Sequence, residues 1–188
     1  MARPVATRGT GRERVLDAAL RLFSTHGVSG TSLQMIAAAL GVTKAAVYYQ
    51  FHAKEDIVVA VLEPAFDEME TFIAHAEVAR GRRAQLEAAL AGLVDIAVSR
   101  QRLAALIGGD PAMSVVVRSH ERFRHLVDRL DRVLVGPEPT AAQRMAVSML
   151  GGGLLMTGAD ARLADLDEET RRTEMLRILR AVLLPPLG

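Results

Sequence analysis

Apolar residues recur every three or four positions along most of this chain, and no stretch alternates regularly between apolar and polar residues. The first spacing is typical of one face of an α-helix, whereas alternation would indicate a half-buried β-strand. Capping residues, glycines and prolines divide the chain into nine predicted helices, so the fold class is expected to be all-α. They cover residues 10–27, 31–40, 43–51, 54–79, 82–99, 100–107 and 111–135, a stretch that begins at Thr140, and a stretch from about Asp167 to Pro185 and Pro186.

Start and stop signals support these limits. Gly27 is expected to end the first helix and Gly41 to form the turn after the second, because glycine adopts a left-handed conformation at little cost. Thr43 is expected to cap the third helix. Capping boxes, in which a hydroxyl precedes a Glu or Gln by three residues, are predicted for Thr10 with Glu13, Thr31 with Gln34, and Thr140 with Gln143.

The first three helices are expected to form one domain, residues 1–53, and the remaining helices a second, residues 54–188. The third helix carries Lys44, Tyr48 and Tyr49 on its outer face, and these are the only two tyrosines in the chain. A short helix with a basic, hydroxyl-bearing face on an apolar partner suits insertion into a DNA groove. The core of the first domain is predicted to contain Leu22, Phe23, Leu33, Ile36, Leu40, Val47 and Phe51.

The charge is distributed unevenly. The net charge of the whole chain is +1, but residues 1–54 hold seven basic and two acidic residues, a net charge of +5, and the remainder carries −4. A basic N-terminal segment followed by an acidic remainder fits a nucleic-acid-binding domain joined to a regulatory domain. A solvated basic tail would give the same numbers.

Composition narrows the class of protein further. There is no cysteine, which fits a reducing compartment and excludes disulfides and thiolate metal sites. The first residues are charged with no apolar segment behind them, so no signal peptide is expected. The longest uncharged apolar run, residues 145–159, is shorter than the roughly 20 residues of a bilayer span. A soluble, cytoplasmic protein without a membrane partner is expected.

The segment around the two short helices resembles the TetR family of bacterial transcriptional regulators. The shared pattern is G-V-x-G-T-S, then I-A-x-x-L-G-V-T-x-x-x-V-Y-Y-x-F-x-x-K-E, and the likeness extends over residues 12–57. It stands here as Gly27, Gly30, Thr31, Ser32, Ile36, Ala37, Leu40, Gly41, Val42, Thr43, Val47, Tyr48, Tyr49, Phe51, Lys54 and Glu55.

The resemblance implies a nine-helix TetR-like architecture, with a three-helix helix-turn-helix domain and a helical domain for ligand binding and dimerisation. It implies a sequence-specific transcriptional regulator, a repressor released from a palindromic operator by a small apolar ligand. The implied partners are double-stranded DNA, a second copy of the chain and an unknown small-molecule inducer.

The same resemblance implies which side chains meet DNA. Phosphate contacts are implied for Thr31, Ser32 and Lys54, with Gln34 reaching a phosphate or a base. Base contacts in the major groove are implied for Thr43, Lys44 and Ala45, and backbone contacts for Tyr48 and Tyr49. The chain departs from the family at Ala53, where Ser or Asn usually caps the next helix, and a weaker cap costs about 0.5–2 kcal/mol. His52 or packing is expected to hold that junction instead.

Each of these residues also has a structural interpretation. Thr31 and Thr43 are expected to cap helices whatever else they do. Tyr49 can pack against the first helix, and Lys54 can be a solvated charge near a helix start, where it opposes the helix dipole.

Two helices in the second domain are apolar on several sides and need cover. We expect them to form a two-fold interface with their copies, the alternative being the thick core of a monomer. The interface residues expected are Met149, Leu150, Gly153, Met156, Met175, Leu179 and Val182.

An apolar ligand is expected to bind between the fourth and seventh predicted helices, and Pro64 is expected to kink the fourth helix and act as its hinge. Arg118 or His120 is considered as the polar anchor. Most of the candidate residues are equally good core residues. They are Phe66, Met69, Phe72, Leu103, Leu106, Met113, Val116, His120 and Phe123.

Other sites are not supported by their spacing. His120 and His125 lie five residues apart, about 140° around a helix, whereas two zinc ligands on one helix need a spacing of four. Gly151–Gly153 lacks the Lys-Ser/Thr ending of a phosphate loop. No catalytic residue, metal or cofactor is expected, and the protein is not expected to be an enzyme. The alternatives are a carrier or helical enzyme for an apolar ligand without a DNA function, and an activator of the same family.

Overall fold

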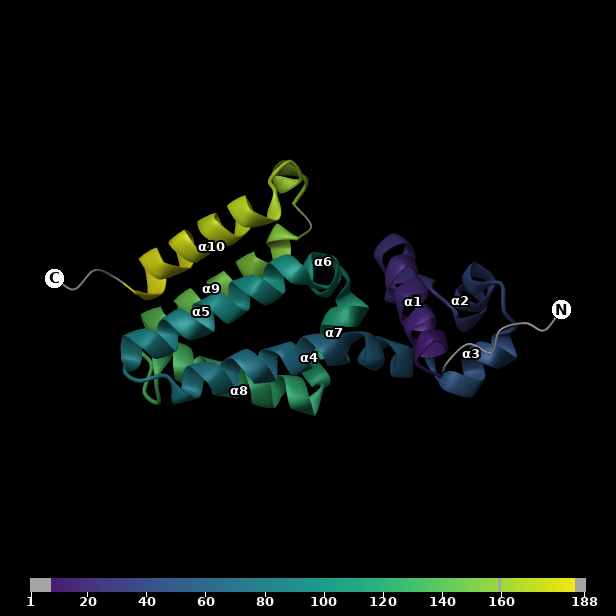
Figure 1. Cartoon of the computed structure of the whole chain (residues 1–188), viewed down its shortest axis with the longest axis horizontal. Coiled ribbons are helices and arrows are strands. Elements are labelled where there is room, and N and C mark those ends of the chain that lie inside the picture. Colours follow the sequence, from purple (N-terminus) through teal and green to yellow (C-terminus); the bar gives the residue numbers. More distant parts are fainter. Residues whose placement is uncertain (1–7, 159, 185–188) are drawn as a thin grey trace. The chain divides into compact units, whose positions relative to one another are not determined.

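The computed structural model of the chain describes residues 8–158 and 160–184, and Figure 1 shows their helices. Within these ranges the structure contains ten α-helices, one short 3-10 helix and no strand. The all-α fold class is therefore confirmed. The predictions about the signal peptide and the stop at Pro185 and Pro186 concern residues outside the described ranges.

The chain divides into two compact units, Met1–Glu63 and Pro64–Gly188. The first holds α1 (Arg8–Gly30), α2 (Leu33–Leu40), α3 (Lys44–Gln50) and the beginning of α4 (Lys54–Val78). Because this boundary falls inside α4, the domain limit at residue 53 stays a prediction. Pro64 lies within α4, and the expected kink there also stays a prediction.

The first unit is built around a small aliphatic and phenylalanine core. Phe23, Ile36, Val47 and Phe51 are fully buried, as predicted. Leu22, Leu33 and Leu40 are only half-buried, because α2 and α3 are short and leave the rim of the core open. Further core positions come from α1 and α4: Val15, Ala18, Ala19, Ile57, Val58 and Leu62.

The backbone of the first unit turns where glycine was expected. Gly27 interrupts α1 with φ 72° and ψ 165°, and Gly41 ends α2 in the left-handed conformation. Two of the three predicted capping boxes are wrong. Helix α1 begins at Arg8, so Thr10 lies inside it, and α2 is capped by Ser32 instead of Thr31. The third box is confirmed, with Thr140 and Gln143 exchanging both hydrogen bonds at the start of α9 (Ala141–Thr157).

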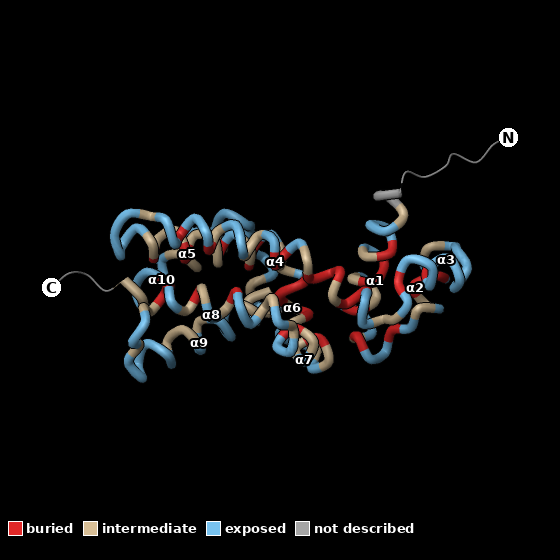
Figure 2. The backbone as a smooth tube through the Cα atoms, turned by 90° about the horizontal axis from the view of Figure 1, so that it is seen from below, coloured by how far each residue is buried: buried red, intermediate tan, exposed pale blue. Residues whose placement is uncertain are grey.

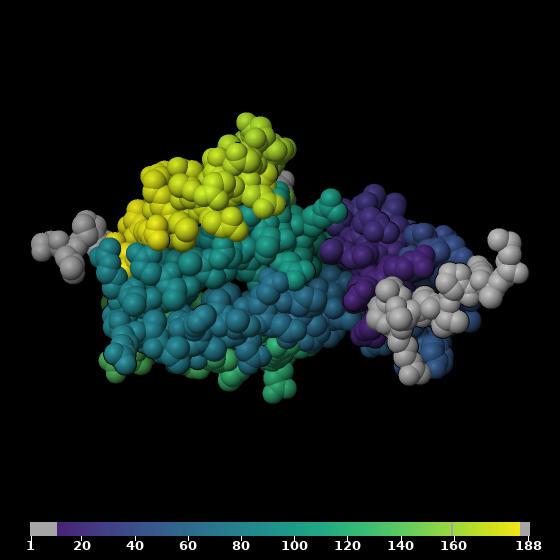
Figure 3. Space-filling view, viewed as in Figure 1, coloured from purple at the N-terminus to yellow at the C-terminus, as the bar shows by residue number. Residues whose placement is uncertain are grey.

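The second unit centres on α5 (Arg82–Ser99), whose Leu90 and Val94 are completely buried. Helix α10 (Glu168–Leu183) lies along α5, as Figures 1 and 3 show, and α8 (Glu121–Val135) packs against α5 as well. Helix α6 (Gln101–Gly109) lies beside α9 and α7 (Pro111–Ser119). The 3-10 helix Ala161–Leu163 precedes α10.

The stretch predicted as one helix, residues 111–135, consists of α7 and α8. The break is at His120, whose extended backbone (φ −72°, ψ 124°) redirects the chain while its N–H still donates to Val116 O and Val117 O. The helical spacing of apolar residues continues through the break, and no glycine or proline lies at it. The sequence pattern therefore predicted a single helix. This correction accounts for the ten helices found where nine were expected.

None of the helices in the described ranges is both long enough and apolar enough to cross a membrane.

Candidate nucleic-acid interface

A tight turn joins α2 to α3. The Gly41 N–H donates to Ala38 O at 3.1 Å and the Val42 N–H to Ala37 O at 3.0 Å, which ends α2. The Thr43 hydroxyl then accepts the Ala46 N–H at 3.2 Å and caps α3, as predicted. Two helices joined by so short a turn make up a helix-turn-helix.

Helix α3 divides sharply into an inner and an outer face. Val47 is 1% exposed, whereas Tyr48 is 51% and Tyr49 84% exposed. Lys44 and Ala45 are exposed as well, and Figure 2 colours most of this helix as exposed. The interpretation that Tyr49 packs against α1 is therefore wrong. The residues named for major-groove contact share one open surface.

Helix α2 contributes fewer groups than the resemblance implied. Ser32 and Gln34 are exposed, and the Ser32 hydroxyl accepts the Met35 N–H at 3.2 Å. Thr31, in contrast, is 2% exposed, and its hydroxyl donates to Gly27 O at 2.8 Å. A buried hydroxyl with a backbone partner cannot reach a phosphate, so the role expected for Thr31 is corrected to a structural one.

Lys54, the first residue of α4, is not the solvated charge that its structural interpretation predicted. Its Nζ donates to Val28 O at 2.6 Å, to Thr31 O at 3.1 Å and to Ser29 O at 3.5 Å. The ammonium is thus held by the backbone between α1 and α2. A phosphate contact by Lys54 would have to replace one of these bonds.

The weak cap at Ala53 is compensated from inside α4. Asp56 Oδ2 accepts the Ala53 N–H at 2.9 Å, which is the backward half of a capping box. This bond was not predicted, although an acidic residue three positions after a helix start is the signal for it. His52, the expected substitute, instead meets the Tyr48 ring edge-on at 5.3 Å between centroids.

In the second unit the structure brings three of the expected ligand residues together. The Phe66 ring lies 5.2 Å from the His120 ring and 5.9 Å from the Phe123 ring. The Nδ1 atom of His120 is buried and has no hydrogen-bond partner among the described residues.

The other expected ligand residues are core residues or lie apart from this cluster. Leu103, Leu106 and Met113 are buried, and Met69 and Val116 are half-buried. Phe72 packs on Gly92 of α5, where an added Cβ would stand 2.2 Å from its ring.

Helix α9 has no buried residue, and Figure 2 colours it intermediate or exposed throughout. Of the expected interface residues, Met149 is 71%, Met156 45% and Val182 48% exposed. Gly153 is exposed, and Leu150 and Met175 are half-buried. Leu179 is 3% exposed. It belongs to the core beneath α10, so its assignment to the interface is corrected.

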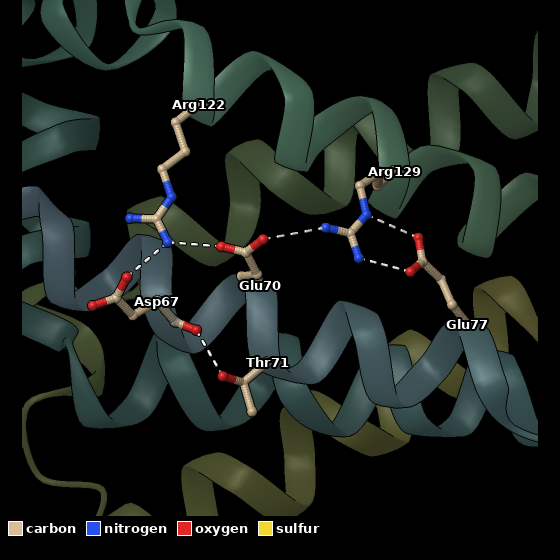
Figure 4. A network of polar contacts seen from close by, with 6 residues as sticks. All are labelled: Asp67, Glu70, Thr71, Glu77, Arg122 and Arg129. Carbon is tan, nitrogen blue, oxygen red and sulfur yellow. Dashed lines mark hydrogen bonds and ion pairs between the residues drawn. The ribbon is translucent and has the colours of Figure 1, made fainter.

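Arginines of α8 and carboxylates of α4 form a ladder of ion pairs, which Figure 4 shows. Arg122 donates to Asp67 at 2.7 Å and to Glu70 at 2.8 Å. Arg129 donates twice to Glu77, at 2.9 and 2.7 Å, and its other terminal nitrogen lies 3.7 Å from Glu70. The Arg129 guanidinium holds the pKa of Glu77 below its ordinary value through these hydrogen bonds. The ladder was missed in the sequence, although acids and arginines each recur there seven residues apart.

The fold and this exposed surface define the class: an all-helical protein with an N-terminal helix-turn-helix. Residues 15–61 match the family model described as bacterial regulatory proteins, tetR family. The chain is 56% identical over 46 residues to the HTH-type transcriptional regulator AcrR of Shigella flexneri, a match that covers 24% of this chain and 21% of AcrR. The chain thus spans about a fifth of the length of that relative. Residues 15–61 thus match the N-terminal model of the TetR family, the resemblance that the sequence pattern led us to expect.

Solved structures extend the likeness of fold to most of the chain. The fatty acid degradation regulator FadR from Bacillus halodurans superposes with a TM-score of 0.68, at 18% identity, over 96% of this chain and 98% of FadR. SmeT in its complex with triclosan superposes with a TM-score of 0.61, at 22% identity, over 92% of this chain and 90% of SmeT. The chain therefore shares its fold with these two regulators.

Proposed function

We propose that this protein is a sequence-specific DNA-binding transcriptional regulator that represses its target genes in the cytoplasm. The observation that carries the proposal is the outer face of α3, where Lys44, Tyr48 and Tyr49 are exposed around a buried Val47. Large tyrosine side chains left 51% and 84% exposed beside an exposed lysine contribute little to the core of the domain. They suit a surface that is covered by a polyanion.

In the proposed complex α3 enters the major groove. Its amino-terminal residues Thr43, Lys44 and Ala45 face base edges, and Lys44 donates to guanine O6 or N7. Tyr48, Tyr49 and Ser32 contact phosphates, which fixes the register of the helix without reading sequence. Gln34 contacts either a phosphate or a base.

The proposed regulator is a homodimer. Exposed apolar side chains on α9 and α10 (Met145, Met149, Met156, Ile178 and Val182) exceed what a soluble monomer usually shows in one region. An added side chain at Gly151–Gly153 would meet no atom within 4 Å, so a second copy can approach that backbone closely. A two-fold dimer places its recognition helices about 34–36 Å apart and so calls for a near-palindromic operator.

We propose further that an apolar small molecule releases the protein from DNA. SmeT, which shares this fold, forms a complex with triclosan. The Phe66, His120 and Phe123 rings and the unpartnered His120 Nδ1 are the groups we assign to such a ligand. The ligand must bind the DNA-free state more tightly than the DNA-bound one.

Selection of random duplexes with the purified protein tests the proposed function. We expect a near-palindromic site to be enriched, and a Lys44→Ala variant that folds normally to lose the enrichment. If the Lys44→Ala variant enriched the same site as the unaltered protein, or if no duplex were recovered at all, the proposed function would be ruled out. The carrier alternative instead predicts binding of an apolar dye such as a naphthalene sulfonate with no response to any DNA.

A further inference from the structure

The chain contains only two lysines, Lys44 and Lys54, and both lie in the first unit. Their surroundings are opposite. Lys44 is exposed at the start of α3, whereas Lys54 is half-buried and its ammonium donates to three backbone carbonyls. The same type of side chain therefore lies in two different environments ten residues apart.

The carbonyls that Lys54 binds lie where α1 ends. Gly27 interrupts the helix with a positive φ, and the last turn leaves carbonyl oxygens without regular helix partners. The Thr31 hydroxyl takes Gly27 O, and Lys54 takes Val28 O, Ser29 O and Thr31 O. A cation is favoured here because the carboxyl end of a helix carries partial negative charge.

The same bonds join the start of α4 to the residues just before α2. Lys54 is the first residue of α4, and Ser32, which caps α2, directly follows the carbonyl of Thr31. On the other side of the junction, Asp56 holds the Ala53 N–H. One cation thus ties the corner that begins α2 to the helix that ends the unit.

We infer that Lys54 is a positioning residue for DNA binding: it orients α2, and through it α3, on α4 and does not itself pair with a phosphate. The inference rests on the proposed function. Its basis is that an ammonium has three hydrogens and that three carbonyls lie within 3.5 Å of it.

The test is a pair of matched variants, Lys54→Met and Lys44→Met, each of which keeps the side-chain stem and removes the charge. Affinity for the selected operator is measured between about 0.05 and 0.2 M salt, well below the melting temperature of each variant. For a phosphate contact, loss of the charge lowers the slope of log affinity against log salt by about one. We expect that change for Lys44→Met only.

For Lys54→Met we expect an unchanged slope and a loss of about tenfold in operator affinity, the size of one misaligned base contact. Lys54→Arg should recover most of the affinity, since its guanidinium can donate to the same carbonyls. A slope lowered by about one in Lys54→Met would show a phosphate contact and overturn the inference. Unchanged affinity in a folded Lys54→Met would overturn it too, because Lys54 would then only stabilise the unit.

A measurement on the unaltered protein covers the case in which Lys54→Met does not fold. Reductive methylation with formaldehyde, followed by peptide mass spectrometry, reports each amine separately. We expect Lys44 to react fast and to be protected by operator DNA, and Lys54 to react slowly with or without DNA. Fast reaction of Lys54 that only DNA suppresses would contradict the inference. If the unaltered protein binds no duplex, the proposed function itself fails, which is a different result.

Discussion

The two parts of α4 are held by cations in two different ways. In the first unit the ammonium of the half-buried Lys54 donates hydrogen bonds to neutral backbone carbonyls, the shortest of them 2.6 Å to Val28 O. In the second unit Arg122 and Arg129 meet three carboxylates, and those of Asp67 and Glu70 are 68% and 53% exposed. Hydrogen bonds from a charge to buried carbonyls are little affected by salt, whereas exposed ion pairs are screened and contribute about 0–1 kcal/mol each. The comparison teaches that similar contacts between helices can differ widely in strength and in salt response.

The largest effect should come from two buried isoleucines that differ only in their unit. Ile57 and Ile73 both lie on α4 and both are 0% exposed. Substituting either by alanine should cost about 2–5 kcal/mol of unfolding free energy. If the units unfold separately, Ile57→Ala should lower the melting temperature of the first unit and Ile73→Ala that of the second. Hydrogen exchange measured peptide by peptide shows which unit loses protection. If either variant lost protection equally in both units, the two units would not be independent.

An intermediate effect is expected from the cations themselves. Lys54→Met should lower the unfolding free energy of the first unit by about 1–3 kcal/mol, because it removes the hydrogen bonds from a charged donor to three backbone carbonyls. Arg129→Met should cost the second unit about 1 kcal/mol or less. Urea unfolding at about 0.05 and about 1 M salt separates the two. The loss in Lys54→Met should stay constant, and the loss in Arg129→Met should shrink with salt. The reverse pattern would contradict the contrast drawn between them.

The smallest effect is a pH dependence at the far end of the ladder. The pKa of Glu77 is held below its ordinary value of 4.5 by the hydrogen bonds from Arg129. A carboxyl with a lowered pKa in the folded state stabilises the fold above its ordinary pKa, and this contribution is lost as pH falls through the folded value. Glu77→Gln should therefore lower the melting temperature slightly at neutral pH and make no difference well below pH 4.5. If the difference in melting temperature between Glu77→Gln and the unaltered protein grew as the pH fell, the lowered pKa of Glu77 would be contradicted.

The sequence predicted the helices well and their polar details less well. Residues 82–99 were predicted as a helix, and α5 has those limits, because apolar spacing and helix ends are local properties. The cap of α2 was misplaced by one residue, since Thr31 and Ser32 both carry a hydroxyl and only the backbone conformation decides which one caps. The break at His120 has no local mark at all.

The candidate site shows the same division. The exposed face of α3 followed from the burial of Val47, which the helical period predicts. The surroundings of Lys54 and Thr31 did not follow, because their partners lie on the backbone of a corner that only the folded chain assembles. The contacts of Arg122 and Arg129 depend on which faces of α4 and α8 pack together. That packing cannot be predicted from a single sequence.

The bond from Ala53 N to Asp56 has a consequence for substitutions at this junction. Because the aspartate accepts a backbone N–H, the bond does not depend on the side chain of residue 53. Replacing Ala53 by any residue other than proline should therefore leave this bond intact, whereas replacing Asp56 by alanine should remove it.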